Sequence, residues 1–422
     1  MSHVVFIDCH GFNFGIMQRA AQLGHRVTLI RPTSFQWYSD SEYIRSVIKL
    51  IDRVVDIKVL TDTSMLLEAI RQVLKQEPID AVINLLDPTI ETTAHACSAL
   101  EIPFTSLEGV LNSRDKARAR ELIATAGLSS LRYSKARDIK GVIAAVKQFD
   151  YPLIMKPVSG FGSVLCSRVN NAREAFLAAQ EILSAAEMVP EMIREQFDRG
   201  VLIEECVKGE LVSAEVGMLN NQMYRFAVTG RSLPEVNECV EMGGIIPADI
   251  SESQANGCFD YAERICEVLG LDFGVFHIEM MITDNGPVLI EANPRLMGGV
   301  MTSAYQFATG CNINDLVIEI YLGRPIQVAL PRTQGFVTIR KMIPLRNGRL
   351  NHSLDLSWFD NLKDCVAHLV NHRIEPGLEV ERFEVLGRFL VWSESLKEAT
   401  EKADWLLDQF EKSLGVKLIK PK

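Results

Sequence analysis

The stretch Pro287-Val288-Leu289-Ile290-Glu291-Ala292-Asn293-Pro294-Arg295 joins an apolar run to three polar side chains at alternate positions. An extended segment places alternate residues on one face, so Glu291, Asn293 and Arg295 would share a face. The apolar run predicts a buried strand, and a charge at the end of such a strand needs a partner because an unpaired buried charge is unfavourable. The alternative is a strand end that carries ordinary surface charges.

A further carboxylate, Glu279, ends the neighbouring apolar run of residues 275–279. Oxygen ligands from Glu279, Glu291 and Asn293 would suit a hard divalent cation such as Mg²⁺, and the guanidinium of Arg295 would suit a phosphoryl group or an oxyanion. His277 shares the face of Glu279 if that run is a strand. It would then either orient a carboxylate or be an ordinary hydrogen-bonded core histidine.

Length and composition limit the class of protein. The 422 residues, 47% hydrophobic and 23% charged, predict a globular protein of two or three domains. Forty-four Lys and Arg against 54 Asp and Glu give a net charge of −10 without a basic block, which argues against a nucleic-acid partner. A pocket for a small anion is still compatible with this charge.

The nine cysteines are scattered without a C-x-x-C pair, and the N-terminus lacks a signal-peptide pattern. No apolar stretch approaches the length that crosses a bilayer. We therefore expect free thiols, a cytoplasmic location and no membrane partner.

The order of strand and helix patterns predicts three parts: residues 1–112, 113–325 and 326–422. The first alternates strands and helices, which predicts a parallel α/β sheet covered by helices, and its loop at 9–15 lacks the G-x-G-x-x-G of a dinucleotide site. Asp87 follows the third strand and either lines a ligand crevice or, as we favour, begins a helix. The other two parts are mixed α+β, and a capping box at Ser395 predicts a closing helix up to Gly415.

Two segments could bind a nucleotide. Lys156 ends an apolar run and is followed by a loop of Gly and Ser (159–163) whose backbone N–H groups could approach a phosphate; a plain hairpin is the alternative. Residues 202–210 form an apolar strand that ends in carboxylates. Its main chain could bind adenine and its Glu side chains could bind ribose, whereas the alternative is an exposed strand end.

These pieces occur in a fixed order: Lys116, Lys156 with its loop, Glu204 to Glu210, Glu279, and Glu291-x-Asn293-x-Arg295. The order resembles the ATP-grasp superfamily over roughly residues 113–325. Within it, the chain resembles the carboxylate–amine ligases of the dipeptide-forming L-amino acid ligase type. The resemblance implies an N-terminal α/β domain, a central ATP-grasp fold with a mobile lid at about 128–205, and a C-terminal α+β domain.

The resemblance also implies a role for each nucleotide-site residue. The ATP phosphates would be bound by Lys116 and Lys156, under a lid loop that contains Ser159, Gly160, Gly162 and Ser163. Adenine and ribose would be held by Glu204, Glu205, Val207 and Glu210. Two Mg²⁺ ions, for which Mn²⁺ could substitute, would be held by Glu279, Glu291 and Asn293. Arg295, with Lys156, would be catalytic and would stabilise the acyl phosphate, and Gly298 and Gly299 would let a substrate approach the backbone.

Two departures from the family pattern concern the lid and the substrate pocket. Leu165 stands where the lid loop commonly has Gly, although Leu adopts a positive φ only at a cost. Gly244 stands where the amino-acid pocket often has His, and Arg231 stands where Lys is common. Arg231, Glu241 and Gly244 are therefore candidate substrate contacts.

The sequence thus predicts an ATP- and Mg²⁺-dependent ligase that activates a small carboxylate as an acyl phosphate and joins it to an amine. The partners would be the carboxylate and amine substrates, and the resemblance allows a homodimer. A carboxylase or formate-using transferase on the same scaffold is one alternative. An ATP-binding regulatory protein without turnover is another.

Overall fold

The computed structural model describes residues 1–160, 164–189, 194–234, 240–326, 333–360, 362, 367–371 and 374–422. The chain divides into two compact units, whose segments we list next. Unit 1 comprises Met1–Phe226, Asn256–Gly299 and Ile313–Val328, and unit 2 comprises Ala227–Ala255, Val300–Asn312 and Ala329–Lys422. The division of the chain into residues 1–112, 113–325 and 326–422 is a separate statement and remains a prediction.

Unit 1 begins with a four-stranded parallel sheet in the order β3-β2-β1-β4. Its strands are β1 (His3–Ile7), β2 (Arg26–Pro32), β3 (Arg53–Ile57) and β4 (Ala81–Ile83). All five residues of β1 are buried, as expected for a central strand with both faces covered. The chain runs outward from β1 to β3 and then returns to the other side of β1, so the direction of winding changes between β1 and β4. The predicted parallel α/β sheet is confirmed.

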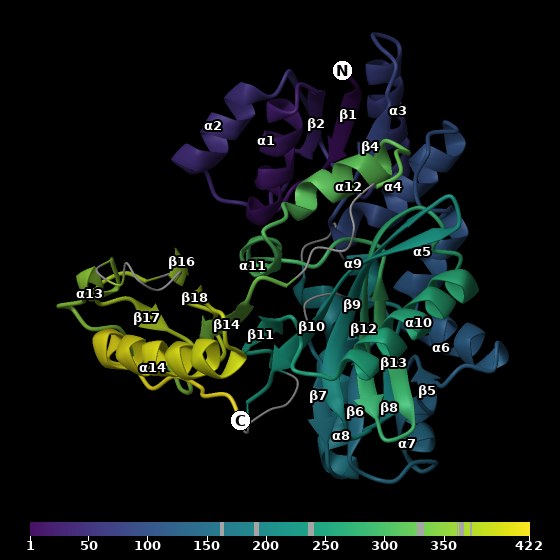
Figure 1. The fold of residues 1–422 in the computed structure, drawn as a ribbon. Coiled ribbons are helices and arrows are strands. Elements are labelled where there is room, and N and C mark those ends of the chain that lie inside the picture. Colours follow the sequence, from purple (N-terminus) through teal and green to yellow (C-terminus); the bar gives the residue numbers. More distant parts are fainter. Residues whose placement is uncertain are drawn as a thin grey trace. The chain divides into compact units, whose positions relative to one another are not determined.

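Helices follow the strands of this sheet. They are η1 (Gly11–Asn13), α1 (Phe14–Gln22), α2 (Glu42–Leu50), α3 (Thr63–Leu74), α4 (Asp87–Ala99), α5 (Leu107–Arg114) and α6 (Lys116–Thr125). Helix α1 packs against α2, and α3 packs against α4 (Figure 1). The favoured interpretation of Asp87 is confirmed, because α4 begins at this residue with Pro88 in its first turn.

The region predicted as a lid contains a four-stranded antiparallel sheet in the order β5-β8-β6-β7. Its elements are β5 (Tyr133–Ala136), α7 (Ile139–Val146), β6 (Leu153–Pro157), β7 (Ser167–Val169), α8 (Ala172–Met188), α9 (Arg194–Phe197) and β8 (Val201–Glu205). Helices α7 and α8 pack together, and their apolar residues form one core with Leu153, Met155 and Ile203 of the sheet. The lid region therefore has a core of its own.

Three antiparallel strands of unit 1 position the acidic residues: β9 (Glu210–Leu219), β12 (Gly274–Thr283) and β13 (Gly286–Asn293). Strand β12 pairs with both β9 and β13. A tight turn joins β12 to β13, and Gly286 supplies the positive φ of 98° at its end. Helix α10 (Glu252–Leu269) precedes β12 in the sequence and α12 (Ile313–Tyr321) comes after β13. Strand β10 (Gln222–Ser232) contains the boundary between the two units.

Unit 2 contains neighbouring antiparallel strands in the order β11-β14-β18-β16. Its elements are β11 (Gly243–Ile246), α11 (Met301–Thr309), β14 (Phe336–Met342), β15 (Gly348–Arg349), α13 (Ser357–Asp360), β16 (Ala367–Asn371), β17 (Glu379–Val380), β18 (Gly387–Ser393) and α14 (Leu396–Leu414). The predicted closing helix is confirmed, because Ser395 caps the start of α14 and Gly415 ends it with a φ of 73°. Among the described helices, none is both long and apolar enough to span a bilayer.

Candidate active site

Glu279 on β12 and Glu291 on β13 lie directly opposite each other in the antiparallel pair. His277 and Asn293 form the pair two residues further along, so all four residues share one face. This is the arrangement that the alternating pattern predicts. Two carboxylates in directly opposite positions repel each other unless a cation lies beside them.

Lys116 supplies one such cation. Its Nζ lies 3.0 Å from Oε1 of Glu291, and the lysine side chain is buried. Lys116 is the first residue of α6, and its backbone N–H donates to the carbonyl of Val158 at 3.2 Å. The start of α6 is thereby attached both to β13 and to the segment that begins the lid loop.

Lys156 and Arg120 share a second buried carboxylate, that of Glu204. Nζ of Lys156 lies 2.8 Å from Oε2 of Glu204, and Nε of Arg120 lies 2.9 Å from Oε1. Burial alone would raise the pKa of Glu204, but the charges of Arg120 and Lys156 hold it below its ordinary value. Glu204 therefore positions Lys156 through an ion pair.

Arg120 is a site residue that the sequence analysis missed. Its guanidinium also donates to the carbonyl of Ile290 at 2.7 Å, beside Glu291. The sequence contains one faint signal for it, since Arg120 stands four residues after Lys116 and so lies on the same face of α6. Arg120 therefore links β8, which carries Glu204, to β13, which carries Glu291.

The other predicted adenine and ribose residues lie at the end of β8 and after it. Glu205 exchanges contacts with Arg132: its N–H donates to the Arg132 carbonyl at 3.1 Å, and its Oε1 accepts from the Arg132 N–H at 2.8 Å. Val207 is half-buried and Glu210 is exposed at the start of β9. Their contact with a nucleotide remains a prediction.

The described part of the lid loop offers an unused donor. Ser159 is fully buried, and its Oγ has no hydrogen-bond partner among the residues that the structure describes. Gly160 has a φ of 152°, and its carbonyl accepts from Arg114 at 3.4 Å. A buried hydroxyl without a partner is unfavourable, so an anion that accepts from Ser159 would stabilise this segment. The predicted contacts of Gly162 and Ser163 lie outside the described residues.

Leu165 does adopt the conformation that the family pattern reserves for Gly. Its φ is 60°, in the left-handed region that Leu enters only at a cost. The side chain is partly buried and packs against the apolar core of the lid region. This packing offsets part of the unfavourable backbone conformation.

Arg295 is fixed by the first residue of helix α4, which follows the last strand of the N-terminal sheet. Its Nε donates to Oδ2 of Asp87 at 2.7 Å, and Arg114 lies 3.1 Å from Oδ1 of the same carboxylate. Burial would raise the pKa of Asp87, but Arg295 and Arg114 hold it below its ordinary value. The sequence analysis weighed a ligand crevice against a helix start for Asp87 and did not predict its contact with Arg295. Beyond Arg295, Gly299 has a φ of 63°, and a Cβ at Gly298 would lie 3.9 Å from the Arg295 guanidinium.

His277 contacts Glu279 and is placed to orient that carboxylate. It is also a buried histidine with both ring nitrogens hydrogen-bonded, so both of its interpretations fit the structure. Its Nε2 lies 2.9 Å from Oε1 of Glu279, and its Nδ1 lies 2.7 Å from Oε1 of the fully buried Glu215 on β9. Burial would lower the pKa of His277, but the two carboxylates raise it to about 9. Carboxylates that bind a metal are themselves hydrogen-bonded by neighbouring side chains, so this contact is compatible with the predicted metal role of Glu279.

The donor set fits Mg²⁺. In the described part of the chain, no group of three or more His, Cys, Asp and Glu side chains could hold a metal by itself. Glu279, Glu291 and Asn293 instead offer two carboxylates and one amide. Mg²⁺ commonly binds through one or two carboxylates together with substrate phosphates and water, so these residues are sufficient when a nucleotide is bound.

The three substrate candidates lie in unit 2. Nε of Arg231 lies 3.5 Å from Oε2 of Glu241, and Lys341 lies 3.2 Å from the other oxygen of that carboxylate. A Cβ at Gly244 would lie 3.0 Å from the Gly230 carbonyl and 3.4 Å from the end of Met301. The surroundings of Gly244 therefore leave little room for a larger residue at this position.

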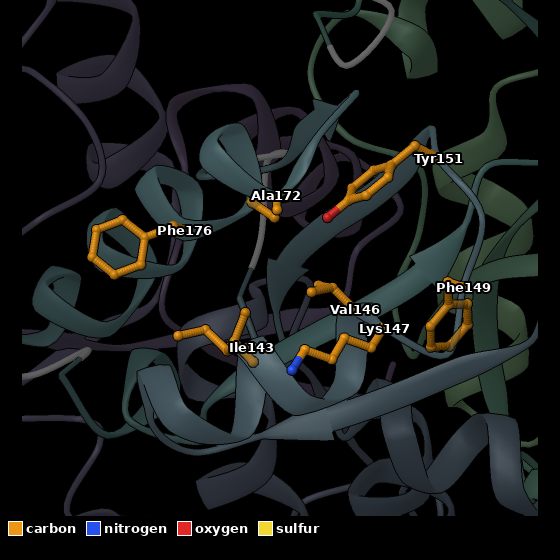
Figure 2. Close-up of a pocket in the computed structure, with 9 residues that line it drawn as sticks. Ile143, Val146, Lys147, Phe149, Tyr151, Ala172 and Phe176 are labelled. Atoms are coloured by element: carbon orange, nitrogen blue, oxygen red, sulfur yellow. The ribbon is translucent and has the colours of Figure 1, made fainter.

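A cavity of about 260 Å³ lies elsewhere, against α7 and the start of α8 (Figure 2). It is lined by Val142, Ile143, Val146, Lys147, Phe149, Tyr151, Ala172, Ala175 and Phe176. This lining is mainly apolar and includes none of the predicted site residues. The charged groups around Glu291, and not this cavity, form the candidate active site.

Comparison with known proteins gives matches to two family models. Residues 17–104 match the ATP-grasp N-terminal domain, and residues 149–304 match the ATP-grasp domain. Alanine–anticapsin ligase of Bacillus amyloliquefaciens is 24% identical over 269 residues, which are 60% of this chain and 56% of that protein. Dapdiamide A synthase of Enterobacter agglomerans is 27% identical over 214 residues, 48% of this chain and 47% of that protein.

The chain thus spans about half the length of the curated relatives that it matches. Among solved structures, an L-amino acid ligase from Bacillus licheniformis superposes with a TM-score of 0.82 at 18% identity, covering 100% of this chain and 99% of that one. This likeness, with the two domain matches, confirms the predicted multidomain fold.

Proposed function

We propose that this chain, which contains an ATP-grasp N-terminal domain and an ATP-grasp domain, is an ATP- and Mg²⁺-dependent carboxylate–amine ligase. It transfers the γ-phosphoryl group of ATP to the carboxylate of an amino acid or small acid. The resulting acyl phosphate then reacts with an amine to give an amide or peptide bond, ADP and phosphate.

One observation carries this proposal: Lys116 lies 3.0 Å from Glu291, and Glu279 lies directly opposite Glu291. A buried ammonium beside two carboxylates that need a second cation is the arrangement expected where Mg²⁺ and phosphates meet. Phosphoryl transfer depends mainly on positioning and on neutralising phosphate charge, and these groups supply both.

Each residue of the site has a place in this reaction. Lys116 and Lys156 bind the α- and β-phosphates, and Ser159 donates to a phosphate oxygen. The nucleotide base and ribose lie at Glu204, Glu205, Val207 and Glu210. Glu279, Glu291 and Asn293 would hold two Mg²⁺ ions, which would supply positive charge that stabilises the phosphates.

Arg295 acts after the nucleotide is in place. Its guanidinium, held by Asp87, faces the acyl phosphate and the oxyanion that forms when the amine attacks the acyl carbon. In that step the C–N bond forms and the C–O bond to phosphate breaks. Gly298 and Gly299 let the substrate approach the backbone, and Arg231, Glu241 and Gly244 contribute to the substrate pocket. A closing lid over residues 128–205 would exclude water, which would otherwise hydrolyse the acyl phosphate.

The named relatives support the choice of reaction class. One relative is named as a ligase of alanine and anticapsin, and the other as a synthase of dapdiamide A. We extend to this chain only the class of chemistry, a small carboxylate joined to an amine.

The test is incubation of the purified protein with ATP, Mg²⁺ and pooled L-amino acids, with phosphate release and product masses as readouts. Amino-acid-dependent phosphate release together with a new amide mass supports the ligase. Release that depends on bicarbonate or formate instead supports the carboxylase or transferase. Tight ATP binding without any release supports the regulatory protein.

A further inference from the structure

The carboxyl edge of the parallel sheet carries a buried acid that the mechanism above does not use. Asp8 is the residue that follows β1, and Asn84 is the residue that follows β4. The winding of the sheet reverses between these two strands, and ligands of open α/β sheets bind in the crevice at such a point. Asp8 is thus placed where the topology favours a ligand.

The backbone at Asp8 is unusual. Its φ is 61°, in the left-handed region that few residues other than Gly occupy, although Asp enters it more readily than most. Residues held in this region are enriched at ligand sites, where the surrounding fold maintains the conformation. The backbone therefore gives an indication of function that is independent of the topology.

The carboxylate of Asp8 is buried without a cation. Only 5% of the residue is exposed, and its hydrogen bonds come from the Cys9 N–H at 2.8 Å and the Thr89 hydroxyl at 3.4 Å. Among the described residues it forms no ion pair, and Arg31 near the same edge is paired with Asp56 at 2.6 Å. Burial raises the pKa of Asp8 to about 7. A cationic ligand would remove the penalty for an unpaired buried charge.

Asp8 is also connected to the reaction centre within unit 1. The first turn of α4 contacts Asp8 through Thr89 and contacts Arg295 through Asp87, two residues earlier. Asn84 donates to the hydroxyls of Thr89 and Thr93 at 3.0 and 2.7 Å and so fixes this turn. A ligand on Asp8 would lie beside the helical turn that positions Arg295.

We propose that Asp8 binds the ammonium group of the amine substrate. This inference rests on the proposed ligase function and names the residue that selects a cationic acceptor. The chemistry fits because the second substrate of such a ligase reaches the site as an ammonium ion, and the buried Asp8 carboxylate, next to the first turn of α4, would hold it close to the acyl phosphate. The ammonium gives up one proton to the Asp8 carboxylate and the free amine attacks the acyl carbon. The C–N bond forms, the C–O bond to phosphate breaks, and the leaving phosphate takes the second proton of the amine.

The experiment separates acyl phosphate formation from capture by the amine. Hydroxylamine, which is largely uncharged near neutral pH, traps the acyl phosphate as a hydroxamate without needing an ammonium site. The amide made from pooled L-amino acids measures the natural capture. For Asp8→Asn we expect the ratio of amide to hydroxamate to fall about 10- to 100-fold, through a higher KM for the amine found in the wild-type product.

Asp56→Asn is the matched control, because Asp56 is an exposed acid of the same sheet paired with Arg31. It should leave the ratio unchanged. If Asp8→Asn has the same ratio of amide to hydroxamate and the same amine KM as wild type, the inference is overturned, while the proposed ligase function stands. If the wild-type protein makes no hydroxamate, the proposed function itself fails.

A second variant keeps the inference testable if Asp8→Asn does not fold. Thr89→Val removes the side-chain donor that fixes the Asp8 carboxylate but retains the charge. It should raise the amine KM several-fold more than the ATP KM. Equal amine KM values for Thr89→Val and wild type would count against the role of Asp8.

Discussion

The guanidinium of Arg295 and the carboxylate of Asp87 are 208 residues apart in the sequence and 2.7 Å apart in the fold. The contact joins the strand that carries Glu291 and Asn293 to the first turn of the helix after β4. It fixes the guanidinium that the proposed mechanism places beside the acyl phosphate. Asp87 is therefore a positioning residue for Arg295.

Asp87→Asn should lower turnover about 10- to 100-fold with a smaller change in ATP affinity, because Arg295 loses its charged partner. The folded state should also lose about 3–5 kcal/mol, the usual effect of breaking a buried ion pair. Steady-state kinetics and urea unfolding measure the two effects. Asp315→Asn, which breaks the half-exposed pair with Arg19, is the control and should change stability by at most about 1 kcal/mol.

Glu291→Ala should lower the turnover rate at least about 100-fold, because the site loses a predicted metal ligand and Lys116 loses its partner. The Mg²⁺ concentration required for nucleotide binding, followed by calorimetry, should rise in the same variant. Glu267→Ala removes an exposed carboxylate of α10 and serves as the control. Wild-type rates in Glu291→Ala would contradict the assignment of the metal site.

The raised pKa of Asp8 makes a prediction about stability and pH. A carboxyl group whose pKa is higher in the folded than in the unfolded state, about 7 against 3.8, lowers stability as pH rises through that window. Burial also raises the pKa of the nearby Cys9, and that of Tyr38, so both titrate above this range. The stability of Asp8→Asn, measured as the difference from wild type, should therefore be higher at pH 8 than at pH 4.5. Urea unfolding of both proteins at the two pH values tests this. A difference in unfolding free energy between variant and wild type that does not change with pH would contradict the raised pKa of Asp8.

Gly244→Ala should destabilise the protein by about 1–3 kcal/mol, because the new Cβ would lie 3.0 Å from the Gly230 carbonyl. Gly257→Ala is the matched substitution. A Cβ at Gly257, within α10, meets nothing within 4 Å, and the change should stabilise by about 0.5–1 kcal/mol. Thermal unfolding of both variants gives the comparison, and equal effects would argue against crowding at Gly244.

The features that sequence reasoning found have local signals. Alternation of apolar and polar residues placed Glu279, Glu291 and Asn293 on one face, and the strand register confirms it. A capping box and a terminal glycine likewise gave the bounds of α14. Period and capping depend on neighbours in the chain, so a single sequence displays them.

The contacts that it missed link residues far apart in the chain. Arg120 reaches Glu204 and the carbonyl of Ile290, and Asp87 reaches Arg295. Neither Arg120 nor Asp87 stands in a motif, since an Arg within a helix and an Asp at a helix start are ordinary residues in those positions. Only the folded structure, in which Arg120 of α6 reaches β8 and β13 and Asp87 of α4 reaches Arg295, reveals their partners.

The central claim is that a carboxylate oxygen attacks the γ-phosphoryl group of ATP at the site around Lys116 and Glu291. The most direct test uses a carboxylate substrate labelled with ¹⁸O in both oxygens, with the released phosphate analysed by mass spectrometry. Because the acyl C–O bond breaks when the amine attacks, the account predicts one ¹⁸O atom in each phosphate released with the amide. Amide formation with unlabelled phosphate would contradict it.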